Sequence, residues 1–335
     1  MKRSLLLINY RSASLAIDAI RTARAASSQP LQVVAVDNSV DASEASALGP
    51  VADVVIAAPR NLGYAGGINA GRRACDGDVI IVTNPDVRFG AGAIDALVDA
   101  DAAVAGPALF WDDEYAWRLP PAELHTARQV ASRALGSRSR AWARARDRRR
   151  FLARVAFWSL AVPTHVPALS GAVLAIKATA FDDAKGFDER FQLYFEENDF
   201  LRRVEGDIVY VPAARCHHLY NQSAGASPES AALFAQSEQQ YLRKWGGAFA
   251  KRFERDVGID RIQEHSPRVF DGDIVIEASP LPTFETAAGH FANGSIADVP
   301  DDVWRAYRGD VLYLRAVDRR SGRVLESWAK ARIRA

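Results

Sequence analysis

A run of acidic residues is the strongest candidate for chemistry in this sequence. Glu196, Glu197 and Asp199 follow an aromatic-rich segment, and two arginines lie one helical turn further on. When carboxylates crowd together, the charge of one raises the pKa of another. A raised pKa suits a general base that takes a proton from a hydroxyl near neutral pH. The same acids also suit the first turn of a helix, so the residues alone leave both interpretations open.

A second group of residues has the types that bind a hard metal ion. The tripeptide NPD at 84–86 directly follows an apolar run, so Asp86 can reach Mg²⁺ or Mn²⁺ while phosphates and water complete the coordination. His217 and His218 follow another apolar run, and a neutral imidazole can complete a site that a carboxylate begins. NPD is also a common turn, and a histidine is more often structural than a ligand. Both interpretations remain open.

The segment NLGYAGGINAG at 61–71 is rich in glycine. Its glycines permit positive φ and a close approach of the backbone, which predicts a loop against a ligand; a purely structural turn is the alternative. The spacing differs from the G-x-G-x-x-G fingerprint, and no strand feeds the segment with an acid about twenty residues further on. A nicotinamide-dependent oxidoreductase is therefore disfavoured.

The elements that position these residues are predicted by short apolar runs alternating with alanine-rich stretches. Leu5–Ile8, Val33–Val36, Val54–Ala57 and Val79–Val82 are expected to be buried strands with helices between several of them. This alternation favours an α/β fold with a mostly parallel sheet covered on both faces. Ligands of such sheets bind beyond the carboxyl ends of the strands, where the polar residues following three of these runs would converge.

Composition excludes several classes of function. The chain has 42 basic and 41 acidic residues, so binding of nucleic acid through bulk charge is not expected. Its two cysteines are far apart, which gives neither a disulfide framework nor a thiolate zinc site and favours a reducing cytoplasm. The first apolar run is too short for a signal-peptide core, and no uninterrupted apolar stretch is long enough to span a membrane. We expect a cytoplasmic protein that at most visits a membrane surface.

Residues 128–154 contain ten arginines and one acid, Asp147. One interpretation is a solvated helical face. The other is an amphipathic segment that rests on an anionic membrane or grips a lipid diphosphate. In the second case the apolar anchors would be Trp142, Phe151, Phe157 and Trp158.

The chain is expected to divide into two domains. A catalytic domain would span 1–262, with a nucleotide-binding half at 1–110, an arginine-rich helical insertion at 111–165 and an acceptor-binding half at 166–262, where residues 230–257 are expected to be helical. The tail at 265–335 alternates like strands, with a hairpin turn at 318–322, and predicts a small β-rich accessory domain.

The order of motifs resembles glycosyltransferase family 2, in particular its rhamnosyltransferase-like and galactofuranosyltransferase-like members. The resemblance covers about residues 4–245. It rests on NY at 9–10, VDNS at 36–39, NLGYAGGINAG, NPD, LSGAVLAIK at 169–177, GFDERF and YFEEND in the following segment, and a histidine near a serine. Each motif is weak alone, but their order and spacing together are specific. The family implies a GT-A architecture.

The resemblance implies roles for individual residues. It implies that Asp37 reads the nucleobase and that Asp86 is the last acid of a DxD-type metal motif whose first acid is replaced by Asn84. It implies Glu197 as the catalytic base, with Asp199 as a rival. His218 lies five residues before Ser223, as the family's metal-associated histidine does, so it is preferred to His217 as the second metal ligand. The expected donor-binding residues are Asn9, Tyr10, Asp37, Asn38, Asn61, Gly63, Gly67, Asn69, Asn84 and Asp86. The expected acceptor-binding residues are Ser170, Gly171 and Glu196.

The expected activity is an inverting, metal-dependent transfer of a sugar from a nucleoside-diphosphate donor to a hydroxyl of a glycan or polyprenyl-diphosphate-linked saccharide. The cofactor would be Mg²⁺ or Mn²⁺. The donor would be linked to dTDP or UDP, with dTDP-rhamnose as the first candidate because of the NPD variant. Two alternatives are a glycoside hydrolase that uses paired acids and a catalytically silent carbohydrate- or nucleotide-binding module.

Overall fold

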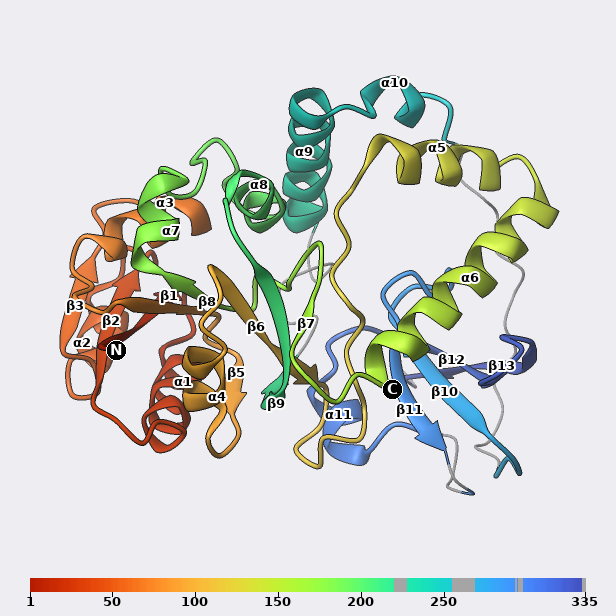
Figure 1. Cartoon of the computed structure of the whole chain (residues 1–335), viewed down its shortest axis with the longest axis horizontal. Coiled ribbons are helices and arrows are strands. Elements are labelled where there is room, and N and C mark those ends of the chain that lie inside the picture. Colours follow the sequence, from red (N-terminus) through yellow and green to blue (C-terminus); the bar gives the residue numbers. More distant parts are fainter. Residues whose placement is uncertain (220–227, 255–268, 293, 295–297, 333–335) are drawn as a thin grey trace.

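The computed structural model describes residues 1–219, 228–254, 269–292, 294 and 298–332 (Figure 1). Nine strands form one large mixed sheet in the order β3-β2-β1-β4-β8-β6-β9-β5, and β7 pairs with β9 beside this path. The strands are β1 (Arg3–Asn9), β2 (Leu31–Asp37), β3 (Val54–Ala57), β4 (Val79–Thr83), β5 (Val87–Phe89), β6 (Val104–Phe110), β7 (Thr164–His165), β8 (Val173–Lys177) and β9 (Ile208–His218).

The N-terminal part of this sheet is parallel, which confirms the sequence prediction. β1 pairs in parallel with both β2 and β4, and β2 pairs in parallel with β3. All four predicted strands lie within observed ones. The register places Asn9 directly beside Asp37, so the carboxyl ends of β1 and β2 bring two polar residues together. β8 then runs antiparallel to β4 and carries the chain into the acceptor half.

Both faces of the sheet are covered by helices. Leu5 and Leu7 belong to one buried cluster and Leu6 and Ile8 to another, because successive side chains of a strand point to opposite faces. The first cluster includes residues of three helices: α1 (Ala13–Ala25), α2 (Ala42–Leu48) and α4 (Ala93–Asp99). The second includes residues of α3 (Gly63–Arg72), α7 (Ala178–Asp183) and α8 (Glu196–Arg203).

The glycine-rich segment forms a helix, α3, where the sequence predicts a loop. Only Gly63 among its glycines has positive φ, at +73°. The others bring α3 close to the sheet: a Cβ on Gly67 would lie 3.0 Å from a methyl of Ile8, and one on Gly71 would overlap the side chain of Leu6. The loop prediction was wrong because these glycines serve helix packing rather than a turn.

The C-terminal region is a second, antiparallel sheet, as predicted. Its strand order is β11-β10-β12-β13. Its elements are β10 (Ile274–Ser279), β11 (Ala288–Ala292), α11 (Asp301–Ala306), β12 (Val311–Asp318) and β13 (Val324–Ala331). The predicted turn at 318–322 joins β12 to β13, where Gly322 has a φ of +66°. The α/β fold class with a small β-rich C-terminal unit is therefore confirmed.

The arginine-rich segment forms two helices, α5 (Ala127–Gly136) and α6 (Arg140–Trp158). Figure 1 shows α6 lying against the C-terminal sheet. Phe151 and Trp158 pack there in one buried cluster with Val275 and Val317 of β10 and β12. The prediction that these two aromatic residues anchor the chain to lipid is thus wrong, because they anchor α6 to the second sheet instead.

Ion pairs reinforce the contact between α6 and the second sheet. Arg154 of α6 pairs with the fully buried Glu277 at 2.5 Å, and Arg315 of β12 pairs with the same carboxylate at 2.7 Å. Arg315 also pairs with Asp147, the single acid of residues 128–154. Removing one partner of such a buried pair leaves an uncompensated charge, so these groups fix the helix on the sheet.

The predicted helix at 230–257 is broken in two. α9 (Pro228–Trp245) ends at Gly246 and Gly247, which have φ angles of +90° and +110°, and α10 (Ala248–Lys251) follows. Residues 255–257 lie outside the described part of the chain. Within the described residues, no helix combines the length and the apolar character needed to cross a membrane.

Candidate active site

Polar residues at the ends of β1 and β2 form a hydrogen-bonded network. The amide of Asn9 donates to Asp37 and to Glu44, both at 2.9 Å. Ser39 donates its hydroxyl to Asp37 at 2.6 Å. Asn9, Asp37 and Ser39 are buried, so the network holds the carboxylate of Asp37 in one orientation. Tyr10, by contrast, is exposed, and the guanidinium of Arg11 lies 5.4 Å from the centre of its ring.

The start of α3 is joined to the same strand ends. Asn38 donates its side-chain amide to the carbonyl of Gly63 at 2.9 Å. Asn61 accepts a hydrogen bond from the backbone N–H of Gly63 at 2.9 Å, which closes a turn before the helix. A Cβ on Gly63 would lie 2.8 Å from the carbonyl oxygen of Gln192, so only glycine fits at this contact. The structure therefore places Asn38, Asn61 and Gly63 together.

Asn69 holds a different position from the other expected donor residues. Its amide donates to the carbonyl of Phe187 at 2.8 Å and to Glu189 at 3.0 Å, and its oxygen accepts from the backbone N–H of Phe187. Its side chain therefore ties α3 to the segment before the acidic run.

The expected metal residues come together from distant parts of the sequence. β5 pairs antiparallel with β9, and this register places Val87 opposite His218. Nε2 of His218 lies 3.3 Å from Oδ1 of Asp86, which is buried. His217 points elsewhere, with Nδ1 2.5 Å from Asp113. The geometry thus favours His218 over its neighbour. Ser223, the other residue of that motif, lies outside the described residues.

The electrostatics of Asp86 also fit a cation-binding carboxylate. Burial works against its ionisation, but the charge and hydrogen bond of His218 and the charge of Arg88 together keep its pKa below the ordinary value. The described residues contain no cluster of three or more histidine, cysteine or acidic side chains placed to hold a metal. The remaining coordination positions would therefore fall to phosphate oxygens and water. Asn84 is fixed through its backbone, with its N–H donating to the carbonyl of Ala172 at 2.9 Å.

The acidic run begins at a strained turn. Tyr194 and Phe195 have φ angles of +70° and +68°, a left-handed conformation that side chains with a Cβ rarely adopt. Helix α8 starts at the next residue, so Glu196 and Glu197 occupy its first turn. The interpretation of these acids as a helix start is therefore confirmed, and the role of a general base stays a prediction. Strain of this kind is frequent at functional sites, where the surrounding structure enforces it.

The two glutamates differ in their surroundings. Glu196 is 5% exposed, and its Oε2 has no hydrogen-bond partner among the described residues. Burial, together with the charge of Glu197, raises its pKa well above the ordinary value. Glu197 is more exposed and accepts a hydrogen bond from Asn198 at 2.7 Å, yet burial raises its pKa as well. Glu197 is thus the more accessible acid of the pair.

Asp199 has a different environment from both glutamates. It is 0% exposed, and it pairs with Arg203 at 2.9 Å and with Lys244 at 2.6 Å. The indole N–H of Trp245 donates to it at 2.8 Å. These bonds join α8 to α9, and the carboxylate of Asp199 is fully engaged with partners inside the protein. The geometry therefore favours Glu197 over Asp199 as a base.

Gly171 connects the acidic run to α3. A Cβ on Gly171 would lie 3.1 Å from Cγ of Glu197, so the glycine leaves room for this side chain. The hydroxyl of Tyr64 in α3 donates to the carbonyl of Gly171 at 3.4 Å. Burial raises the pKa of Tyr64 strongly, and the charges of Glu196, Glu197 and Asp86 raise it further. The backbone N–H of Asn84, two residues before Asp86, donates to the carbonyl of Ala172, the residue after Gly171. Residues 171–172 therefore join the expected base to the expected metal segment.

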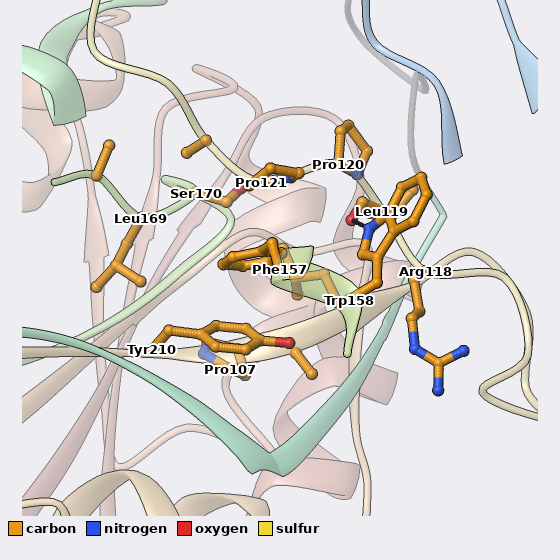
Figure 2. Close-up of a pocket in the computed structure, with 14 residues that line it drawn as sticks. Pro107, Arg118, Leu119, Pro120, Pro121, Phe157, Trp158, Leu169, Ser170 and Tyr210 are labelled. Carbon is orange, nitrogen blue, oxygen red and sulfur yellow. Dashed lines mark hydrogen bonds between the residues drawn. The ribbon is translucent and has the colours of Figure 1, made fainter. Parts of the chain in front are cut away.

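Ser170 directly precedes Gly171. Its hydroxyl accepts from the backbone N–H of Ala172 at 3.3 Å. Figure 2 shows Ser170 and Leu169 beside a pocket lined by Phe157, Tyr210 and three prolines. This pocket measures only about 30 Å³, which is too small for a sugar ring.

Comparison with known proteins agrees with these features. A model of the family described as glycosyl transferase family 2 matches residues 4–122. N-acetylglucosaminyl-diphospho-decaprenol L-rhamnosyltransferase of Mycobacterium tuberculosis (strain CDC 1551 / Oshkosh) is 31% identical over 250 residues, or 65% of this chain and 75% of the relative. The protein of that name from strain ATCC 25618 / H37Rv matches equally well.

The chain belongs to glycosyl transferase family 2. This family 2 protein is a glycosyltransferase with an α/β fold, as the sequence motifs predict. Membership of the family decides against a glycoside hydrolase and a nicotinamide-dependent oxidoreductase.

Solved glycosyltransferase structures resemble the chain more distantly. GalNAc-T7 with UDP, GalNAc and Mn²⁺ has a TM-score of 0.48 and 14% identity over 72% of this chain, which spans 48% of that protein. The mannosyltransferase PcManGT from Pyrobaculum calidifontis, in complex with GDP-Man and Mn²⁺, has a TM-score of 0.47 and 14% identity over 75% of this chain and 69% of its own. The assignment to family 2 rests on the sequence relatives and not on these likenesses.

The sequence interpretation of this glycosyltransferase missed three residues of the site. Tyr64 lies inside the motif NLGYAGGINAG, in which the glycines and asparagines carry the sequence prediction. Glu44 joins the Asn9 network from α2, and nothing in its local sequence marks it. Asn198 lies between the acids, and its hydrogen bond to Glu197 became visible only with the turn geometry.

Proposed function

We propose that this glycosyltransferase transfers a sugar, with inversion, from a nucleoside diphosphate to a hydroxyl of a lipid-linked saccharide. One observation carries the proposal: the backbone at 171–172 contacts both the proposed base and the NPD segment. A Cβ on Gly171 would lie 3.1 Å from Cγ of Glu197, and the next carbonyl, of Ala172, accepts from the N–H of Asn84 at 2.9 Å. The Asn9–Asp37 network at the ends of β1 and β2 supports a nucleotide site on the same edge of the sheet.

Asp86 and His218 are the proposed ligands of a divalent cation, Mg²⁺ or Mn²⁺. Their carboxylate and imidazole atoms lie 3.3 Å apart, and both donor types bind such ions. When bound, the ion would neutralise the charge of the departing diphosphate. Asn38, Asn61, Gly63 and Gly67 at the start of α3 are the proposed neighbours of the donor.

Glu197 is the proposed catalytic base. It removes the proton from the acceptor hydroxyl while that oxygen attacks the anomeric carbon from the face opposite the diphosphate. The new glycosidic bond forms as the bond to the diphosphate oxygen breaks, and direct displacement inverts the anomeric centre. Ser170, Gly171 and Glu196 are the proposed residues on the acceptor side. Asp199 has its proposed role in positioning α8 rather than in taking the proton.

The substrates follow from the relative. Its name describes transfer of L-rhamnose to N-acetylglucosaminyl-diphospho-decaprenol. We therefore propose dTDP-rhamnose as the donor, and as the acceptor a saccharide that begins with N-acetylglucosamine on a polyprenyl diphosphate, within cell-surface polysaccharide synthesis. Such an acceptor is embedded in a lipid bilayer, so the proposal includes peripheral contact with an anionic membrane.

The test measures donor binding and turnover separately. Calorimetry with dTDP, UDP, GDP and their sugars, each with and without Mn²⁺, identifies the donor, because a ligand that binds only the native state stabilises it. Turnover is then measured with the selected nucleotide sugar and a short-chain lipid diphosphate carrying N-acetylglucosamine. Nuclear magnetic resonance of the product determines the anomeric configuration.

The expected result is metal-dependent binding of dTDP-rhamnose and a product of inverted configuration. Binding without turnover on any acceptor would support the silent binding module instead. No response to any nucleotide, or retention of configuration, would overturn the proposal.

A further inference from the structure

One face of the molecule combines exposed aromatic side chains with arginines. It lies along α5, α10 and the first turns of α6, which Figure 1 shows along one edge of the molecule. Phe249 is 73% exposed and Trp142 is 45% exposed, and Leu135 and Phe253 are exposed beside them. We call this the α5–α10 face; it consists of Leu135, Arg138, Arg140, Trp142, Arg144, Phe249, Arg252 and Phe253.

Local contacts fix these side chains in exposed positions. A Cβ on Gly247 would lie 3.3 Å from Ala127, so α10 is packed closely on α5. The rings of Phe249 and Phe253 are 5.1 Å apart, and the guanidinium of Arg138 lies 5.7 Å from the centre of the second ring. The indole N–H of Trp142 donates to the carbonyl of Ser132 at 3.1 Å. The aromatic residues are therefore held outward and do not fold back into a core.

Two sets of arginines in this part of the molecule differ in their partners. Arg146, Arg150 and Arg154 form ion pairs with Glu285 or Glu277 of the C-terminal region. Within the described part of the chain, no acid forms an ion pair with Arg140, Arg144 or Arg252, which are exposed. The outward group therefore gives this face a local positive charge, although the whole chain carries a net charge of only +1.

The α5–α10 face is also joined to the candidate active site. Val130 of α5 belongs to one buried cluster with Phe191, Phe195 and Tyr241. Phe195 is the strained residue directly before Glu196, and the ring of His125 contacts it at 4.8 Å between ring centres. A partner that binds α5 and α10 would therefore be held at a fixed position relative to Glu196.

We propose that the α5–α10 face docks on an anionic lipid bilayer. The aromatic and leucine side chains enter the boundary between headgroups and acyl chains, and the arginines contact lipid phosphates. The inference rests on the proposed lipid-linked acceptor, and it identifies the surface that brings the enzyme to that acceptor. Of the apolar anchors expected from the sequence, Trp142 alone belongs to this face, whereas Arg138, Arg140 and Arg144 come from the arginine-rich segment that the sequence analysis singles out.

Cosedimentation with vesicles tests the proposal. The probes are vesicles of phosphatidylcholine with phosphatidylglycerol and vesicles of phosphatidylcholine alone, at low and at physiological salt. We expect binding to the anionic vesicles that weakens with salt. Replacing Arg140, Arg144 and Arg252 by glutamine should weaken it roughly 100-fold, since each basic residue near the surface contributes about a fivefold factor.

Matched control variants test whether vesicle binding depends on this face or only on the overall charge and hydrophobicity of the protein surface. Arg21→Gln with Arg73→Gln removes two exposed charges from the nucleotide half and should leave binding nearly unchanged. Phe249→Ser with Phe253→Ser should weaken binding at least tenfold, whereas Val162→Ser, also at an exposed site, should not. Equal binding by the arginine variant and the wild type, or no binding by the wild type at low salt, would overturn the proposal.

Two further readouts keep this inference apart from the proposed function. Nucleotide binding by calorimetry should be the same in the α5–α10 variants and the wild type, which also shows that the variants are folded. Turnover of a water-soluble acceptor analogue should be unchanged, while turnover of an acceptor embedded in anionic vesicles should fall with vesicle binding. A loss of turnover on both acceptors would contradict a docking role.

Discussion

The proposed donor side and the acidic turn of this site are built in opposite ways. On the donor side, Asn9, Asp37 and Ser39 satisfy one another through hydrogen bonds. At the acidic turn, Phe195 is held in a left-handed conformation and Glu196 has an oxygen without a partner among the described residues. The donor side is thus stable without a substrate, whereas the acidic turn retains strain and burial costs, as reactive groups often do.

Substitution of Glu197, the proposed base, is expected to have the largest effect, because it should stop turnover and leave donor binding intact. Glu197→Gln keeps the shape of the side chain but cannot take a proton, so kcat should fall about 100- to 10,000-fold. Calorimetry should find the affinity for donor and Mn²⁺ within about twofold of the wild type, since the donor side does not depend on this carboxylate.

Two variants make this result specific. Glu205→Gln, at an exposed position just beyond α8, should keep full activity. Asp199→Asn should lower the melting temperature, because it breaks the pairs with Arg203 and Lys244, while folded molecules keep turning over. Full activity of Glu197→Gln, together with a folded but inactive Asp199→Asn, would transfer the role of base to Asp199.

Substitution of Asp86, the proposed metal ligand, should have the opposite pattern and impair the donor side of the site. Asp86→Asn should weaken Mn²⁺-dependent nucleotide binding at least about tenfold, because a neutral amide is a poorer ligand for a hard cation. Nucleotide binding without metal should change little, and Asp76→Asn, an exposed acid of the same half, serves as the control. Unchanged affinity in the presence of Mn²⁺ would count against Asp86 as a ligand.

The pH dependence of activity should report the burial of Glu197. Burial raises its pKa above the ordinary 4.5, and the base acts only when ionised, so kcat/KM should rise with pH through the raised value. Asn198 donates to the charged carboxylate and lowers this pKa. Asn198→Ala should therefore move the acidic limb to higher pH and reduce activity several-fold at pH 6 relative to pH 8. A limb that moves to lower pH would contradict this assignment.

The sequence predicted local features of the site better than contacts between its parts. The buried strands and the polar residues that follow them were predictable, because the pattern of apolar residues that indicates a buried strand spans only a few consecutive positions. The meeting of Asp86 with His218 required the pairing of β5 with β9, and only the family resemblance anticipated it.

Two errors have one physical cause, which is tertiary packing. Glycine disfavours helices, so NLGYAGGINAG indicated a loop, yet contacts of Gly67 and Gly71 with β1 stabilise a helix there. Phe151 and Trp158 lie on one face of α6, and the sequence alone does not reveal that the C-terminal sheet covers this face. Of the aromatic residues proposed to contact lipid, Trp142 belongs to the insertion, whereas Phe249 and Phe253 come from a part of the chain that the pattern did not link to it.

The smallest predicted effect concerns Asn69, which the family resemblance places among the donor residues. Its amide bonds to Phe187 and Glu189 instead link α3 to the segment before the acidic run. Asn69→Ala should therefore lower the free energy of unfolding by about 1–3 kcal/mol, measured by urea titration, since it leaves the backbone groups of Phe187 unpaired. Nucleotide affinity well below the melting temperature should change less than about twofold. A large loss of nucleotide affinity with unchanged stability would instead make Asn69 part of the donor side. The donor side would then extend along α3 as far as Asn69.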